Sequence, residues 1–340
     1  MTRKKKEIIA LIVFLLALIS FIVCASAITM PKRYELGANW GAFIEEERDS
    51  MDVVFFGSSM AYCNVIPAII WENSGISSYV MAGPEQTLGI TYYYVKEMFR
   101  HQSPSAVMVE ISSIIYGQYA SDGAIKANIG YMPYNINRFG ATINAAPQSE
   151  WLGLFFPLYN YHDRWSKLNA DDYQIGLEGY DIDLLAGYNF LSRSNPQPEM
   201  RERSFEQTAE EYQNNISYLA QIAQLCLEHN CRPIFYISAS YAYFAEDYLQ
   251  QLQTDIANIE GAEFINFMDD IGQLGIDNAT DFYDILHFNY RGAEKFSIFL
   301  ANTINKLGIT AQSPYNNPQL WQQRSDYYRS LIEQNSKQEH

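Results

Sequence analysis

An alternation of short apolar runs with helical patterns limits the fold of this chain more than any other feature. Apolar runs of strand length occupy residues 52–56, 77–81 and 106–111, and the stretches 67–73 and 87–100 between them favour helices. Runs that are apolar throughout are typical of strands buried on both faces, as in a parallel sheet covered by helices. The sequence therefore predicts a β-α-β-α-β unit of an α/β protein.

The same alternation resumes in the second half of the chain. Strands are predicted at 232–238 and 262–268, and helices at 205–229, 243–258 and 291–307. The whole pattern predicts a three-layer α/β/α domain over residues 51–310, with a parallel sheet of about five strands. Residues 112–203 interrupt it with an irregular segment rich in Tyr, Asn and Gly. We expect an insertion that folds over the rim of the sheet, a common place for substrate recognition.

The N-terminal residues 1–30 predict a basic stub and a transmembrane signal anchor. A basic cluster from Arg3 to Lys6 precedes 23 positions, 8–30, without a charged residue. A helix of that length reaches about 34 Å, enough to cross a bilayer. Basic residues before the span keep the N-terminus in the cytoplasm. A cleaved signal peptide is the alternative, because residues 25–27 have the A-x-A form. Both interpretations place the rest of the chain outside the cytoplasm, at the cell membrane.

Two segments flank the predicted domain. Residues 31–50 form a charged connector, in which we expect a short helix that holds the domain away from the membrane. Residues 311–340 form a polar tail, which either packs as a last helix or frays. Cys226 and Cys231 could form an extracellular disulfide or remain two semi-buried thiols.

Net charge and the spacing of Cys and His residues limit the partners and ligands that the chain could bind. The net charge of −16 argues against nucleic acid as a partner. The sequence has no CxxC motif and no Cys/His cluster at zinc spacing. We therefore predict no metal and no cofactor.

Three residues that are distant in sequence are predicted to meet at one edge of the sheet. Ser59 directly follows the first strand, whereas Asp284 and His287 lie between the last strand and the last helix. In an open parallel sheet, ligands collect at the carboxyl ends of the strands. A serine becomes nucleophilic when a histidine takes its proton and a carboxylate orients the ring. Asp284 and His287, three residues apart, share one side of a helical turn. Either motif alone is common in non-catalytic turns and caps, so the prediction rests on their conjunction.

This pattern resembles the SGNH/GDSL-type hydrolases, which have a flavodoxin-like three-layer fold, over residues 52–112 and 205–307. The resemblance implies Ser59 as nucleophile, His287 as base and Asp284 as its orienting partner. In the family, backbone amides and an Asn side chain form the oxyanion hole.

The oxyanion hole is the part of the family pattern that this sequence matches least. One amide would come from Ser59, and "MAGPEQTLG" leaves a choice among Gly83, Glu85 and Gln86 for the other. The family's usual Asn after the third strand is missing from "EISSIIYG". The loss of such a donor costs about 2.7–4 kcal/mol of transition-state stabilisation.

The stretches "FGSSMAYCNVIP" and "DILHFNYRGAEKFSIFL" look most like a membrane-anchored subgroup, which includes teichoic-acid D-alanine transfer proteins and polysaccharide O-acetyltransferases. The resemblance implies an extracytoplasmic serine acyl-ester enzyme, either an O-acyltransferase or an esterase. Its substrates would be a cell-envelope polysaccharide or an acylated carrier, and its partner a membrane-bound O-acyltransferase. The alternative is a non-catalytic accessory or glycan-binding protein that works with such an acyltransferase.

Two further features have more than one interpretation. His162, Arg164 and Trp165 lie in the aromatic stretch "FPLYNYHDRW", where Arg and rings suit a hydroxylated or anionic polymer. The aromatic residues of that stretch could instead pack the insertion onto the sheet. Glu110 ends the third strand, either as an acceptor behind the site or as a strand-terminal charge.

Overall fold

The centre of the protein is a parallel sheet of five strands in the order β2-β1-β3-β5-β7. The computed structural model describes residues 2–31, 40–170, 172–173, 180–197, 199–313 and 317–338. The sheet comprises β1 (Val53–Gly57), β2 (Ser78–Ala82), β3 (Ala106–Glu110), β5 (Arg232–Ile237) and β7 (Glu263–Asn266). This is the 2-1-3-4-5 order of flavodoxin-like sheets, so the predicted parallel sheet is confirmed.

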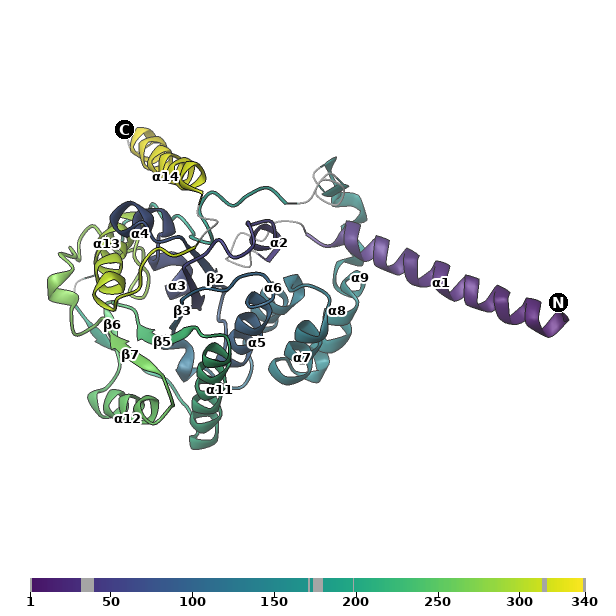
Figure 1. Ribbon diagram of the computed structural model, residues 1–340, viewed down its shortest axis with the longest axis horizontal. Helices are drawn as coiled ribbons and strands as arrows, with labels where there is room; N and C mark the ends of the chain where they lie inside the picture. Colours follow the sequence, from purple (N-terminus) through teal and green to yellow (C-terminus); the bar gives the residue numbers. More distant parts are fainter. Residues whose placement is uncertain are drawn as a thin grey trace.

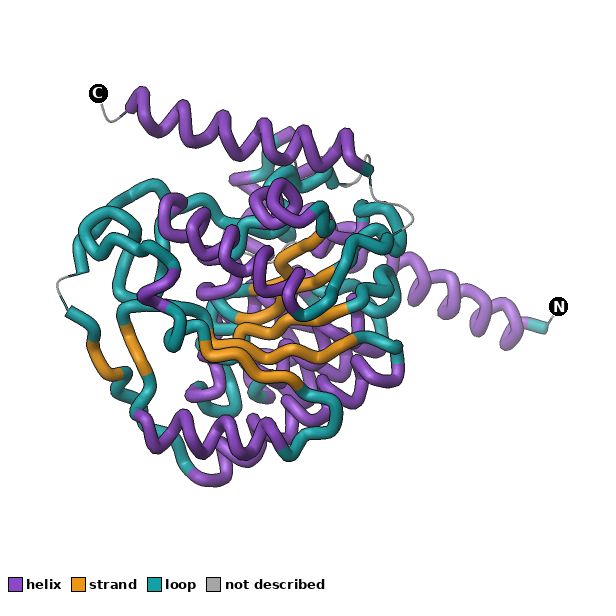
Figure 2. The backbone as a smooth tube through the Cα atoms, turned by 60° about the vertical axis from the view of Figure 1, so that its left-hand side comes forward, coloured by secondary structure: helices purple, strands orange, loops and turns teal. Residues whose placement is uncertain are grey.

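Helices cover both faces of the sheet (Figure 2). One layer contains α3 (Ser59–Asn64), α4 (Pro67–Ser74) and α13 (Tyr290–Lys306), and the other contains α5 (Leu88–Met98) and α11 (Ala209–Glu228). Successive strand residues point to opposite layers. Phe55 belongs to the core under α4 and α13, whereas Val54 and Phe56 belong to the core under α5 and α11. The three-layer arrangement is therefore confirmed.

Several elements around the sheet differ from the predicted ones. α3 begins directly at Ser59, where only a turn was expected. α12 (Glu246–Ala257) begins later than predicted, because β6 (Ala242–Tyr243) pairs in parallel with β4 (Arg201–Glu202). The 3₁₀ turn η5 (Ile271–Gln273) follows β7.

Residues 180–197 of the insertion contain no helix or strand, as predicted. Residues 112–167, in contrast, consist largely of short helices, so for them the prediction of an irregular segment was wrong. These helices are η1 (Ser112–Ile115), α6 (Asp122–Asn128), η2 (Ile129–Tyr131), α7 (Ile136–Ala145), η3 (Gln148–Glu150), α8 (Trp151–Phe155), α9 (Pro157–Tyr161) and η4 (His162–Lys167). Most are too short to show a periodic apolar face. α7, the longest, buries Asn137, Arg138 and Thr142 together with Ala141 and Ala145, so its inner side mixes polar and small apolar residues.

The N-terminal helix α1 (Arg3–Thr29) is long and apolar enough to cross a membrane, and it projects from the body (Figure 1). Its last turn is packed against the body, because Ala25, Ser26 and Thr29 are buried.

The connector does not hold the domain away from this helix. Its helix α2 (Trp40–Ile44) buries Trp40 and Phe43 completely in the main core. Residues 32–39 of the connector lie outside the described part of the chain.

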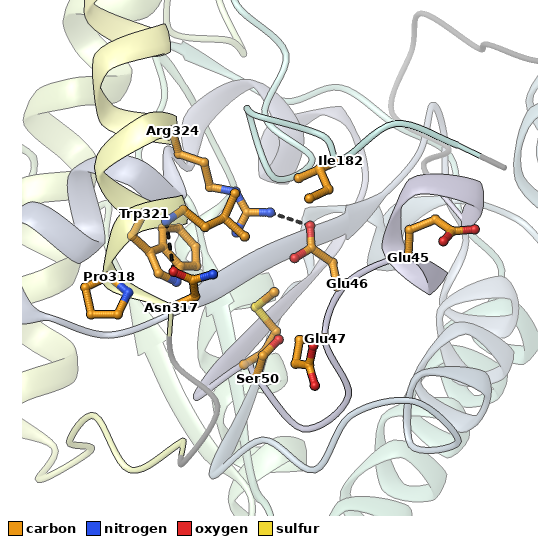
Figure 3. Close-up of a pocket in the computed structure, with 11 residues that line it drawn as sticks. Glu45, Glu46, Glu47, Ser50, Ile182, Asn317, Pro318, Trp321 and Arg324 are labelled. Atoms are coloured by element: carbon orange, nitrogen blue, oxygen red, sulfur yellow. Dashed lines mark hydrogen bonds and ion pairs between the residues drawn. The ribbon is translucent and has the colours of Figure 1, made fainter. Parts of the chain in front are cut away.

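Most of the polar tail folds as a helix, α14 (Pro318–Gln338), which packs on α4 through a stacked pair of rings, Trp71 and Trp321. Arg324 forms a fully buried ion pair with Glu46 (Figure 3). A cavity of about 400 Å³ lies beside this pair, lined also by Ser50. Since Ser50 precedes β1, the cavity lies at the amino-terminal edge of the sheet.

Candidate active site

Gly57 shapes the turn that presents Ser59 at the carboxyl end of β1. Its φ of +144° lies in a region that favours glycine. A Cβ at this position would lie 2.9 Å from the carbonyl oxygen of Glu110 on the neighbouring strand. The next helix then begins at Ser59, and the amides of a helix's first turn have no acceptor within the helix.

Ser59, His287 and Asp284 are brought together in the predicted order. Ser59 Oγ lies 2.7 Å from His287 Nε2, although 228 positions separate the two residues. His287 Nδ1 lies 2.8 Å from Asp284 Oδ2 and 2.9 Å from Oδ1. This is the geometry of a serine beside a base that a carboxylate orients.

The electrostatics of Asp284 favour its ionised form. Burial alone would raise the pKa of Asp284, but the His287 ring and the backbone N–H groups of Leu286 and His287 donate hydrogen bonds to it. These bonds, with the His287 charge, hold the pKa of Asp284 below its ordinary value. An ionised Asp284 accepts the Nδ1–H of His287, and the Nε2 lone pair then faces the Ser59 hydroxyl.

Asn64 links α3, the helix that begins at Ser59, to the loop that carries His287. It is fully buried at the end of α3, and its Oδ1 accepts the N–H of Phe288 at 3.0 Å. Its Nδ2 donates to Ser238 Oγ at 3.0 Å, at the end of β5. Sequence reasoning missed Asn64, because nothing in "AYCN" distinguishes this residue from any helix-terminal Asn.

Glu110 lies at the end of β3. It accepts hydrogen bonds there, so it is an acceptor and more than a strand-terminal charge. Its Oε1 accepts the hydroxyl and N–H of Ser112 and the N–H of Ser238. Burial raises the pKa of Glu110, opposed by the Ser112 bonds and by the charge of Arg203.

Arg203 is a second residue that the sequence did not reveal. Burial lowers the pKa of its guanidinium, opposed by the charge of Glu110. Its Nη2 lies 3.1 Å from Met60 Sδ and 3.4 Å from Ser240 Oγ. The half-buried Arg203 therefore lies against the residue that follows Ser59, and its charge interacts with that of Glu110.

The amides predicted for the oxyanion hole differ in their availability. The N–H of Gly83 donates to Gly57 O at 3.4 Å, and that of Gln86 donates to Gly83 O at 3.3 Å. The Glu85 side chain accepts the N–H of Ser121, and its backbone has a φ of +44°. Among the described residues, the Glu85 amide has no acceptor. The assignment of the oxyanion hole stays a prediction, with Ser59 and Glu85 as the two amides not committed elsewhere.

His162, Arg164 and Trp165 lie at the end of α1. Arg164 donates to the carbonyl of Thr29 at 2.6 Å and to Asp172 at 3.0 Å. His162 Nδ1 donates to the carbonyl of Tyr159, and Trp165 is exposed. Their contacts are with α1 and the insertion, and their predicted role in substrate binding is still only a prediction.

The described residues contain no cluster of metal ligands and no paired cysteines. Within the described ranges, no three His, Cys, Asp or Glu side chains are grouped so that they could hold a metal ion. Cys226 and Cys231 form no disulfide in this structure. Both are buried thiols.

Comparisons with known proteins find similarity to solved structures alone. No family profile matches the chain, and no curated protein matches it. A solved structure of a putative acylhydrolase from Bacteroides fragilis aligns over 79% of this chain and 94% of its own, at 12% identity and a TM-score of 0.38. The proposal below rests on the arrangement of Ser59, His287 and Asp284 in this chain.

Proposed function

We propose that this chain is a membrane-anchored serine acyl-ester enzyme of the SGNH type. The observation that carries the proposal is the continuous hydrogen-bonded path from Ser59 Oγ through His287 to the Asp284 carboxylate. Its position at the carboxyl edge of a parallel sheet is where α/β folds of this order bind ligands.

The mechanism follows from the proton positions. Ser59 Oγ attacks the ester carbonyl carbon while its proton moves to His287 Nε2. Asp284 stabilises the imidazolium, and backbone amides at Ser59 and Glu85 stabilise the oxyanion. The imidazolium then returns its proton to the leaving alcohol, which leaves an acyl-Ser59 ester. His287 next takes a proton from an acceptor hydroxyl, whose oxygen attacks the carbonyl carbon of this ester. The bond between that carbon and Ser59 Oγ breaks, and the imidazolium returns its proton to Oγ, which restores Ser59 and His287.

The proposed substrates belong to the cell envelope. The acyl donor is an acylated carrier or polysaccharide, the acceptor is a glycan hydroxyl or water, and the partner is a membrane-bound O-acyltransferase. Support comes from the resemblance of the motifs around Ser59 and His287 and from α1, which is apolar and long enough to anchor the domain. In the proposed orientation the N-terminus is cytoplasmic and the catalytic domain is extracellular.

Turnover of p-nitrophenyl acetate by the full-length chain tests the proposal. We expect hydrolysis by the unmodified protein and its loss in Ser59→Ala. Ser58→Ala is the matched control, because it removes the neighbouring hydroxyl, and it keeps the activity. Loss of activity in both variants, or in neither, would contradict the assignment of Ser59.

The same assay separates hydrolysis from transfer and from an accessory role. An oligosaccharide that raises the release of p-nitrophenol and becomes acylated identifies a transferase. An oligosaccharide without effect identifies an esterase. A properly folded chain that releases no p-nitrophenol and binds the oligosaccharide would support the accessory role instead.

A further inference from the structure

The insertion carries an exposed apolar surface beside the end of α1, which we call the insertion face. It is formed by Ile136, Phe139, Leu152, Phe156, Tyr159 and Trp165. Each of these side chains is between 50% and 71% exposed. Figure 1 shows α7, α8 and α9, which carry most of them, on the side of the body from which α1 projects. Large exposed apolar surfaces are rare on soluble proteins and mark interaction sites.

The helix α7 shows that this exposure is built into the fold. Its outer side carries Ile136 and Phe139, whereas Asn137 and Arg138 are buried, at 4% and 3% exposure. Arg138 is held there by hydrogen bonds to two backbone carbonyls, at 2.8 and 2.6 Å. Ala141, Thr142 and Ala145 complete the inner side, so the large apolar side chains Ile136 and Phe139 face outward, whereas a surface helix in water has its large apolar side chains inward. The outer side of α7 therefore suits apolar surroundings.

The length of α1 places the insertion at the boundary of a bilayer. Burial by the body begins at Ala25, so the freely exposed apolar stretch extends from Ile8 to Cys24. That stretch rises about 25 Å, less than the hydrocarbon core of about 30 Å. The next turn contacts α9 and η4, since Ser26 Oγ accepts the N–H of Leu158 and the Thr29 carbonyl accepts Arg164. These elements thus lie at the depth where the hydrocarbon layer ends.

We propose that the insertion face lies in the interfacial layer of a phospholipid bilayer. Tyr and Trp are enriched at that layer, because each ring combines an apolar body with a polar group. The insertion face contains one of each, Tyr159 and Trp165. The proposal rests on α1 spanning the membrane, which is part of the proposed function. Its consequence is a fixed orientation of the domain on the bilayer. α7 is tied to α5, on the sheet, by a 2.8 Å hydrogen bond from Asn144 to Tyr93.

Fluorescence quenching in nanodiscs tests the proposal with the full-length chain. Cys63, Cys226 and Cys231 are buried, so Cys24→Ala removes the one exposed thiol of the described residues. Ile136→Cys or Tyr159→Cys is then added and labelled with the environment-sensitive dye NBD. The matched control is Gln253→Cys on α12, an exposed position at the end of the body away from α1 (Figure 1). Labelled Cys24 in the unmodified chain reports separately on the span.

We expect phospholipids with a shallow doxyl group to quench the labels at 136, 159 and 24, and to leave the label at 253 unchanged. If the label at Cys24 is quenched and those at 136 and 159 emit as in water, the insertion face is not at the bilayer. A blue-shifted but unquenched emission at 136 and 159 would place the face against protein, either a second copy or a partner, and would also overturn the proposal. An unquenched Cys24 label would overturn the span itself. None of these readouts depends on catalysis.

Discussion

At the scale of single residues, the site depends on side chains that position the reacting groups as much as on the reacting groups themselves. Ser59, Asp284 and His287 were predictable because their chemistry requires those residue types at the carboxyl edge of a sheet. Asn64 and Arg203 were not, because their roles come only from tertiary neighbours. Asn64 holds the backbone beside His287, and Arg203 lies against the residue after Ser59.

The Asn64 side chain forms two hydrogen bonds, to Phe288 and to Ser238, and we call this pair of bonds the Asn64 clamp. Asn64→Ala leaves the buried N–H of Phe288 without its acceptor and costs about 1–3 kcal/mol of stability. Because His287 is next in sequence, its ring shifts relative to Ser59, and the rate of labelling by a fluorophosphonate falls about tenfold or more. The control is Asn73→Ala, whose amide bonds only to the carbonyl of Ile69 in its own helix. A wild-type labelling rate in Asn64→Ala would contradict the clamp.

The buried Glu110 leads to a prediction about pH. Burial raises the pKa of Glu110, so the folded protein binds this proton more tightly than the unfolded chain does. The stability this gives is complete below the unfolded pKa of about 4.3 and is lost as pH rises through the folded pKa. Glu110→Gln cannot titrate. Between the two pKa values, the free energy of unfolding of the wild type should therefore fall relative to the variant, by up to about 1.4 kcal/mol per pH unit. Urea denaturation of both proteins across this pH range measures the two free energies of unfolding. A difference between them that stays constant with pH would contradict the raised pKa of Glu110.

At the scale of elements, the strands were predictable and the insertion was not. β1, β2, β3 and β5 are largely apolar because both of their faces are buried, and this leaves a clear signal in sequences such as "VVFF", whereas the edge strand β7 is only half-buried. The insertion helices lack such a signal, since α7 presents Phe139 outward and buries Arg138. Likewise, α3 was missed because its six residues follow the β1 turn directly and nearly all are buried, so they show no helical period.

The turn after β1 gives a prediction for an element boundary. Gly57→Ala places a methyl group against the backbone of Glu110 in a backbone conformation that L residues avoid, and should cost about 3 kcal/mol or more. Gly75→Ala is the control, because Gly75 also has a positive φ, of +74°, but no atom lies within 4 Å of the added Cβ. We expect the control to lose about 1 kcal/mol. Thermal unfolding in detergent compares the stability of the two variants. Equal losses of stability would show that the contact between residue 57 and β3 is unimportant.

At the scale of the whole molecule, segments far apart in sequence complete the domain. α2 and α14 approach it from opposite ends of the chain, and Glu46, two residues beyond the end of α2, forms a buried ion pair with Arg324 on α14. This pair could not be predicted from the sequence, because both residues lie in charged or polar stretches that favour solvent. The tail is thus part of the folded body.

The pair of Glu46 and Arg324 can be tested against an exposed ion pair on the same helix. Arg324→Leu leaves the buried carboxylate of Glu46 without its partner and should cost about 3–5 kcal/mol. Arg329→Leu removes pairs with Glu72 and Glu294, but its side chain is 44% exposed, and the loss should be about 1 kcal/mol or less. Chemical denaturation of both variants gives the comparison. Equal, small losses would mean that α14 contributes little to the body.

The central claim is that Ser59 is the activated nucleophile of the site that His287 and Asp284 complete. The most direct measurement is mass spectrometry of peptides from the full-length chain after reaction with a fluorophosphonate. We predict a single phosphonyl adduct on Ser59, absent from Ser58 and abolished in His287→Ala. An unmodified chain, or an adduct on another serine, would contradict the claim.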